Sequence, residues 1–146
     1  MREFLLMATV LTMFPPARAQ EAPRSDLEGY LLRFDYAERR NMKISSRELV
    51  KLIKEGRAVL LDIRFKEEHA AWRMGFGLHI PMNELPKRLH ELDRSKLIVT
   101  ACPHKDRSAL AMAYLKTQGF EVKYLEDGLV GLAEWLRGDT AREFMP

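Results

Sequence analysis

The chain has 146 residues, of which 47% are hydrophobic and 31% are charged, a composition typical of one ordinary globular domain. This length leaves no room for two independent domains of usual size. The net charge is +3, from 24 basic and 21 acidic residues, and without a concentrated Lys/Arg stripe this balance suits small anions but gives no case for a nucleic-acid partner.

The first 19 residues have the layout of a secretory signal peptide. An apolar run at 4–14 precedes Ala17-Arg18-Ala19, whose small residues predict cleavage before Gln20. The run is too short to cross a bilayer as a helix, so no stable membrane span is expected. The sequence therefore predicts a periplasmic or secreted protein. The alternative is a cytoplasmic protein that begins with an ordinary apolar segment.

Residues 20–43 are predicted to form a polar linker followed by an N-terminal helix. Ser25 or Asp26 is placed to cap this helix, which runs to about residue 40. Apolar residues recur along it at helical spacing, namely Leu27, Tyr30, Leu31 and Phe34. This stripe either packs on the chain's own domain or forms a surface for a homo-oligomer or another partner.

Residues 44–140 are predicted to form one domain in which helices and strands alternate. Ser45-Ser46-Arg47-Glu48 is a capping box that begins a helix to about residue 55, and Gly56 closes it. Alternation with short loops predicts an α/β fold, with a parallel sheet and helices on both faces. Strands are expected at 58–63, 78–80, 96–101 and 121–125. Further helices are expected at 66–74, 83–92, 107–118 and 129–136.

Cys102 is the only cysteine, so an intramolecular disulfide is excluded. It directly follows a predicted strand and precedes a helix, at the edge of a parallel sheet where ligands bind. Converging backbone N–H groups and the helix dipole favour a thiolate there. Three nearby cations act in the same direction, whereas Asp106 opposes them or caps the helix. These cations are His104, Lys105 and Arg107.

The alternative for Cys102 is a small buried hydrophobe, the usual state of a free cysteine. Its place at the start of a polar loop, outside the apolar strand, favours a reactive thiol instead. Arg107 lies where a helix dipole disfavours a cation unless an anion is bound. The histidines have no ligand spacing, so neither a metal site nor a cofactor is expected. They are His69, His79, His90 and His104.

Residues 44–138 resemble a single-domain rhodanese, the sulfurtransferase family. Leu60-Leu61-Asp62-Ile63-Arg64 resembles the family's Asp-x-Arg strand end, and Glu68 matches the acidic residue that follows. Residues 73–77 stand at the family's His-Ile-Pro-Gly-Ala turn, and His79-Ile80-Pro81 aligns with Asn-Ile-Pro. The loop from Cys102 to Ser108 matches Cys-x-x-x-x-Arg-Ser, and the segment from Gly128 to Trp135 resembles the closing Gly-containing helix with its Trp.

The resemblance implies a sheet of about five strands and a persulfide on Cys102, formed from a thiosulfate-like donor and passed to a thiol or another nucleophile, including a protein acceptor. Backbone N–H groups of the loop would hold the outer sulfur, but Pro103 has none to donate. Lys105 stands where the family often has glycine. Together with His104, it would recognise either the donor's anionic end or an anionic partner. The binding loop implied is Pro103, His104, Lys105, Asp106, Arg107 and Ser108, with Asp62 and Arg64 as structural neighbours.

Three other functions compete with this one. Cysteine phosphatases of the same fold place five residues between cysteine and arginine, whereas four separate Cys102 from Arg107; the shorter loop suits one sulfur better than a phosphate. A non-enzymatic binding module is a second alternative, although its inactive examples often lack the cysteine. A thiol relay, in which Cys102 forms a mixed disulfide with a partner, is the third.

Overall fold

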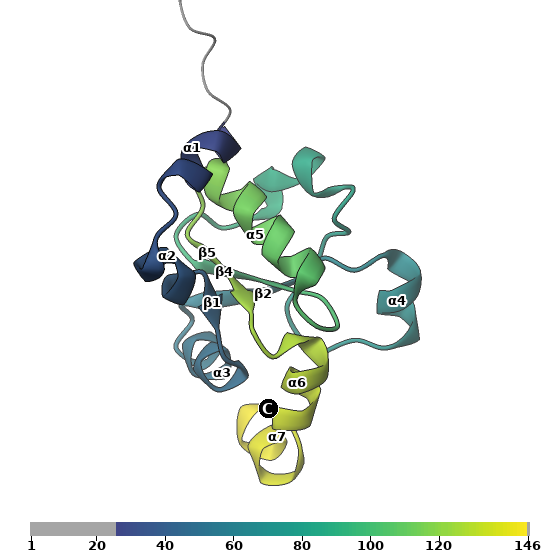
Figure 1. Cartoon of the computed structure of the whole chain (residues 1–146). Coiled ribbons are helices and arrows are strands. Elements are labelled where there is room, and N and C mark those ends of the chain that lie inside the picture. The colour runs from purple at the N-terminus through teal and green to yellow at the C-terminus, as the bar shows by residue number, and fades with distance from the viewer. Residues whose placement is uncertain (1–25, 146) are drawn as a thin grey trace, which may run out of the picture.

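The computed structural model describes residues 26–145 (Figure 1). The predicted signal peptide lies outside the described residues. Among helices in the described part of the chain, none has the length and apolar character needed to cross a membrane.

A five-stranded sheet forms the centre of the molecule, and every strand pair in it is parallel. The spatial order is β1-β5-β4-β2-β3, which places β4 at the middle. Its central pairing with β2 sets Asp62 opposite Ala101, so the carboxyl ends of both strands meet at one edge. The strands are β1 (Lys43–Ile44), β2 (Ala58–Asp62), β3 (Leu78–His79), β4 (Leu97–Ala101) and β5 (Val122–Leu125).

Helices cover both faces of this sheet, as the alternating pattern predicted (Figure 1). On one face α5 (Asp106–Thr117) packs over a core that includes Met112 and Leu115. On the other face α3 (Ser46–Lys54) and α6 (Gly128–Trp135) enclose a second core that includes Leu49 and Leu129. The capping box of α3 is present, since Ser45 and Glu48 bond reciprocally to each other's backbone N–H groups.

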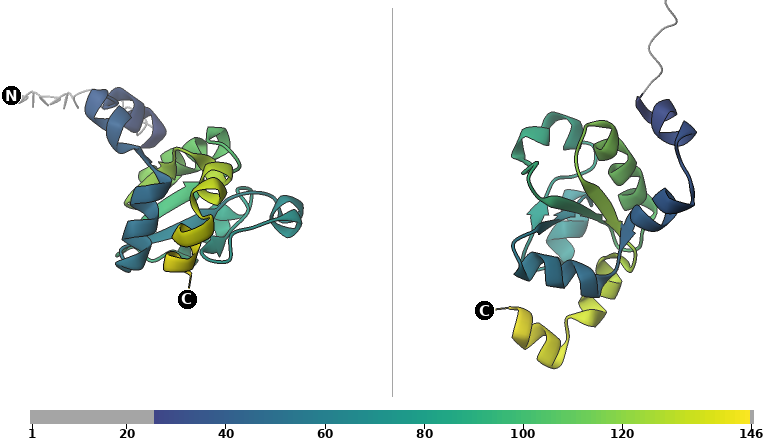
Figure 2. Two further views of the ribbon diagram at one scale, coloured as in Figure 1. Left: turned by 90° about the horizontal axis from the view of Figure 1, so that it is seen from below. Right: turned by 90° about the vertical axis from the view of Figure 1, so that its left-hand side faces the viewer.

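The prediction of a single N-terminal helix is wrong. Instead of one helix to residue 40, two short helices form, α1 (Asp26–Leu32) and α2 (Tyr36–Asn41), because the Asp35 carboxylate accepts a bond from the Glu38 N–H and begins a new helix. Neither contains a buried residue. Tyr30 donates to Glu38 at 2.8 Å, and Lys116 of α5 pairs with the same carboxylate. Figure 2 shows both helices at the periphery of the domain.

Three further elements differ from the sequence prediction. The expected helix at 83–92 is two 3-10 turns, Leu85–Lys87 and Leu89–Glu91, because Pro86 lacks an N–H and restricts the residue before it. Strand β1 was not predicted, since two residues carry too little alternation to be recognised. A last helix, α7 (Gly138–Phe144), follows the predicted end of the fold and packs Phe144 edge-on against Phe76.

Helix α4 (Lys66–Ala71) stands away from the sheet on two extended arms (Figures 1 and 2). It ends at Ala71, three residues before the predicted end, and the backbone of the next residue, Trp72, is extended. The fully buried Arg64 holds both arms: its guanidinium pairs with Asp62 at 2.7 Å, donates to the Trp72 carbonyl at 2.8 Å and lies 4.2 Å from the centre of the Trp72 ring. This single side chain therefore fixes where α4 leaves and rejoins the domain.

We expect Arg64→Met to lower the free energy of unfolding by about 3–5 kcal/mol, because Asp62 then keeps a buried charge without its partner. Urea unfolding followed by circular dichroism measures this change. The double variant Asp62→Asn with Arg64→Met should recover part of the loss, since no buried charge remains unpaired. A single variant as stable as the natural chain would contradict this account of the pair.

Candidate active site

The loop predicted to carry the chemistry connects the end of β4 to the first turn of α5. All five residues of β4 are buried, and Cys102 is the first residue after it. Lys105 is the N-cap of α5, without a side-chain bond, and Asp106 is the first helical residue. The candidate loop, Cys102 to Ser108, therefore lies where the sequence placed it, at the carboxyl edge of the sheet.

The sequence favoured a reactive thiol over a small buried hydrophobe at Cys102, and the structure shows that the residue is buried. Its side chain is fully buried and belongs to the core beneath α5. The reason is that the first turn of α5 folds back over the strand end, so that the sulfur contacts Asp106 Oδ1 at 3.7 Å and Ser108 Oγ at 3.6 Å. The thiol thus begins the polar loop, as predicted, but points into the protein.

The N-terminal end of α6 holds the loop from its other side. The N–H of Leu129 donates to the Cys102 carbonyl at 2.8 Å, and the N–H of Val130 donates to the Pro103 carbonyl at 3.2 Å. Because the peptide bond is planar and trans, the His104 N–H points opposite to the Pro103 carbonyl and so away from α6. Helix α6 therefore binds the loop through these two carbonyls, and the His104 N–H points to the opposite side of the loop.

This contact requires a glycine at position 128. Its φ is +66°, in the left-handed region, and a Cβ there would lie 2.3 Å from the Pro103 carbonyl oxygen and 2.4 Å from that of His104. Any other residue would be strained and would push the loop away. From the sequence, Gly128 was identified only as part of the closing helix. Its place between β5 and an apolar helix is the sequence feature that could have indicated its role.

Two hydroxyl groups fix the remainder of the loop. Thr100 Oγ1, fully buried in β4, donates to the Ser108 carbonyl at 2.8 Å. Ser108 Oγ, also fully buried, donates to the Lys105 carbonyl at 3.1 Å. Together these bonds tie the strand before Cys102 to the helix turn after it, so the loop is closed on itself around the sulfur.

The anion that Arg107 was expected to need comes from the protein itself. Both terminal nitrogens of Arg107 bond to the two carboxylate oxygens of Glu68 at 2.7 Å each. These hydrogen bonds lower the pKa of Glu68 to about 2, so the pair is ionised at neutral pH. A residue of the outlying α4 thus neutralises the arginine of the loop.

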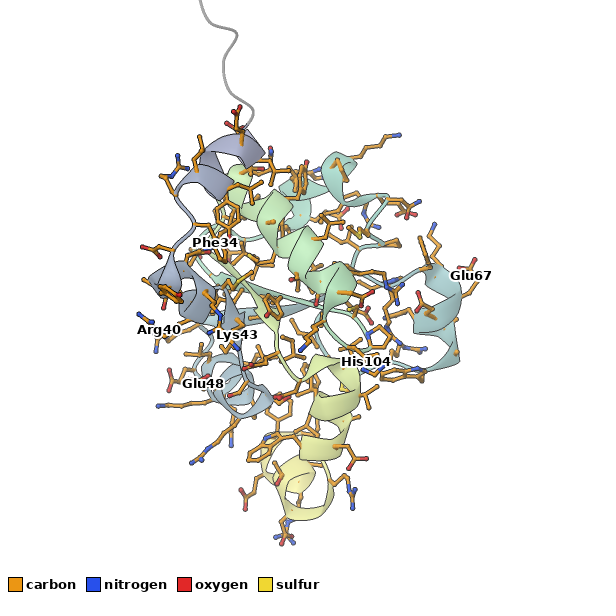
Figure 3. All side chains as sticks on the ribbon, viewed as in Figure 1. Phe34, Arg40, Lys43, Glu48, Glu67 and His104 are labelled. Atoms are coloured by element: carbon orange, nitrogen blue, oxygen red, sulfur yellow. The ribbon has the colours of Figure 1, made fainter. Side chains whose placement is uncertain are left out.

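The other charged loop residues differ in their surroundings. Asp106 is solvent-exposed, and the backbone N–H of Arg107 holds the pKa of its carboxyl below the usual range. His104 and Lys105 are exposed, and within residues 26–145 neither side chain has a hydrogen-bond or ion-pair partner. Figure 3 shows His104 between α6 and α4, and Glu67 on the far side of α4. Lys105 is therefore the unpaired cation of the loop among the residues that the structure describes.

Asp62 and Arg64 pair with each other beside the strand end that precedes Cys102, as described above. Two of the scattered histidines do come together: His69 of α4 and His79 of β3 stack with ring centres 3.7 Å apart and planes 2° from parallel. Parallel rings cannot both point a nitrogen at one metal ion. Within the described residues no group of three His, Cys, Asp or Glu side chains is placed to hold a metal.

Comparisons with known proteins agree on one family. The model of the rhodanese-like domain matches residues 45–134. The chain is 34% identical over 71 residues to "Putative sulfurtransferase YtwF" of Bacillus subtilis, which covers 49% of this chain and 69% of that relative.

Solved structures agree with this match. A rhodanese-related protein of Thermoplasma volcanium is 28% identical with a TM-score of 0.57, covering 63% of this chain and 90% of that one. A thiosulfate sulfurtransferase of Pseudomonas aeruginosa is 26% identical with a TM-score of 0.60, covering 78% of this chain but only 22% of that one. The CoADR-RHD protein of Bacillus anthracis is 26% identical with a TM-score of 0.59, covering 64% of this chain and 17% of that one.

We expect Gly128→Ala to displace the loop from α6 and to expose Cys102. The left-handed backbone alone costs about 1–2 kcal/mol, and the clash with the loop carbonyls adds to this. Gly56→Ala is the matched control, because φ is +70° there but nothing lies within 4 Å of the added Cβ. Iodoacetamide should label Cys102 faster in the first variant only; equal labelling of both would contradict the role of Gly128.

The Glu68–Arg107 pair should make stability depend on acidic pH. Because the folded pKa of Glu68, about 2, lies below the ordinary value of 4.5, its contribution is complete above pH 4.5 and is lost as pH falls towards 2. Solvent screening of these partly exposed groups limits it to about 1 kcal/mol. Glu68→Gln should therefore lower stability at pH 7 but not at pH 2, as measured by urea unfolding. A uniform loss at both values would contradict the electrostatic account.

Proposed function

This chain belongs to the rhodanese-like domain family, and we propose that it is a sulfurtransferase that carries sulfur as a persulfide on Cys102. The observation that carries the proposal is the closed loop of four residues between Cys102 and Arg107, positioned by α5 on one side and α6 on the other. A loop this short suits one further sulfur on Cys102 better than a tetrahedral phosphate.

The reaction has two displacement steps. The Cys102 sulfur, as it loses its proton, attacks the outer sulfur of a thiosulfate-like donor; a new S–S bond forms, the donor's S–S bond breaks and sulfite leaves. An acceptor thiolate then attacks the outer sulfur of the persulfide and releases the Cys102 sulfur, which regains its proton. The protein returns to its starting state, and no metal or cofactor enters either step.

The charges around the loop support an anionic donor. Glu68 neutralises Arg107, so the exposed Lys105 and His104 are the groups left to attract the sulfonate end. The partners of this function are a small sulfur donor and a thiol or protein acceptor. The proposal also places the reaction in the periplasm or outside the cell, as the layout of the first 19 residues predicts.

A second candidate function is a non-enzymatic binding module of the same fold. The full burial of Cys102 favours it, since a sealed thiol behaves as a small core hydrophobe. For the enzyme, burial means that the loop must open before a donor reaches the sulfur. Reaction with an alkylating reagent in the folded protein therefore separates the two candidates, and inertness would favour the binding module.

We expect the natural chain to gain the mass of one sulfur atom after incubation with thiosulfate, and to lose it on treatment with a thiol reductant. Cys102→Ser should abolish this gain and all sulfur transfer while keeping the fold, because serine is close in size to cysteine. Intact-protein mass spectrometry measures the gain, and circular dichroism checks the fold. Transfer activity retained by Cys102→Ser would refute the mechanism.

A further inference from the structure

The proton of the Cys102 thiol has few ways out of the protein. The side chain is fully buried, so water does not reach the sulfur. Among the described residues, the polar side-chain groups in contact with the sulfur are the Asp106 carboxylate, at 3.7 Å, and the Ser108 hydroxyl, at 3.6 Å. The single S–H proton can be donated to either oxygen. While the loop is closed, a proton that leaves the sulfur must therefore pass to one of these two groups.

Ser108 gives the proton no route to solvent. Its hydroxyl is as deeply buried as the thiol, and its own proton is committed to the Lys105 carbonyl. A hydroxyl is also too weak a base to keep a proton from a thiol. Ser108 can hold the sulfur in place, but it connects the thiol to no solvent.

Asp106 joins the buried sulfur to the outside. One carboxylate oxygen contacts the thiol, and the residue as a whole is solvent-exposed. The N–H of Arg107 holds the pKa of this carboxyl low, so the group is ionised and ready to accept a proton. Because the residue is solvent-exposed, the carboxylic acid then releases the proton to water. Among the described residues, the other exposed residues of the loop, His104 and Lys105, make no hydrogen bond with the sulfur.

We propose that Asp106 is a catalytic residue that carries the proton between Cys102 and solvent. This inference rests on the proposed function, because it concerns the step that forms the persulfide. It gives a role to a carboxylate that, by charge alone, would oppose a thiolate.

The steps balance as follows. Asp106 accepts the thiol proton while the Cys102 sulfur attacks the donor; the new S–S bond forms, sulfite leaves with the electron pair of the broken bond, and the carboxylic acid gives its proton to water. In the second half, Asp106 takes a proton from water. It returns this proton to the Cys102 sulfur as the acceptor thiolate removes the outer sulfur.

The test follows persulfide formation in the full chain by rapid quenching and intact-protein mass spectrometry after thiosulfate is added. Asp106→Asn keeps the shape of the side chain but cannot accept the proton. We expect it to form the persulfide about 10²-fold more slowly at pH 7, the usual size of a lost general base. The deficit should shrink as pH rises, since the thiolate then forms without a base.

A second variant keeps the test independent of folding. Asp106→Ala leaves space for a small carboxylate, and added formate should restore persulfide formation in proportion to its concentration. Glu67→Gln is the matched control: Glu67 is another exposed carboxylate, and it lies on the far side of α4, away from the loop (Figure 3). It should form the persulfide at the natural rate and show no response to formate.

The outcomes separate the two proposals. If the natural chain gains a sulfur but Asp106→Asn gains it as fast or faster over the whole pH range, Asp106 carries no proton and the inference is overturned. If formate fails to restore Asp106→Ala although the variant is folded, the inference is likewise overturned. If the natural chain itself never gains a sulfur, the proposed function fails first, independently of Asp106.

Discussion

The site depends on the contact between the first turn of α6 and the loop after β4. Two backbone bonds, from Leu129 and Val130, engage the carbonyls of Cys102 and Pro103, and the absence of a side chain at Gly128 allows the two backbones to approach. Without this support a short loop between a strand and a helix would have several conformations of similar energy. With it, the thiol, the first turn of α5 and the loop amide of His104 hold fixed relative positions.

The electrostatics of the site are largely internal. Glu68 of α4 neutralises Arg107, and Asp62 neutralises Arg64. Arg107, which the sequence suggested would need a bound anion, is therefore already paired within the protein. Both pairs also anchor α4, which makes no extensive packing contact of its own and is additionally held by the stack of His69 on His79. Helix α4 is thus fastened by charges and rings rather than by an apolar core.

The sequence predicted the architecture well where periodicity was strong. Strands β2, β4 and β5, helix α5 and the capping box of α3 follow directly from apolar runs, turn residues and caps, and the parallel arrangement follows from their alternation. It failed where local signals were weak or misleading. Asp35 begins a second helix within the predicted N-terminal helix, Pro86 breaks the helix expected at 83–92, and β1 is too short to have a pattern. These errors leave the centre of the sheet unaffected, because long buried strands are specified by many residues and short edge elements by few.

What the sequence determined by itself is the place of each candidate residue along the fold: a single cysteine directly after a buried strand, followed by four residues, an arginine and a helix. What only the tertiary structure decided is which groups these residues meet. The burial of Cys102, the pairing of Arg107 with Glu68 thirty-nine positions away and the close approach of Gly128 to the loop all join segments that are distant along the chain. The physical reason is that strand and helix patterns record local burial and hydrogen bonding, whereas the partners of a charge or a thiol are set by how the packed elements meet.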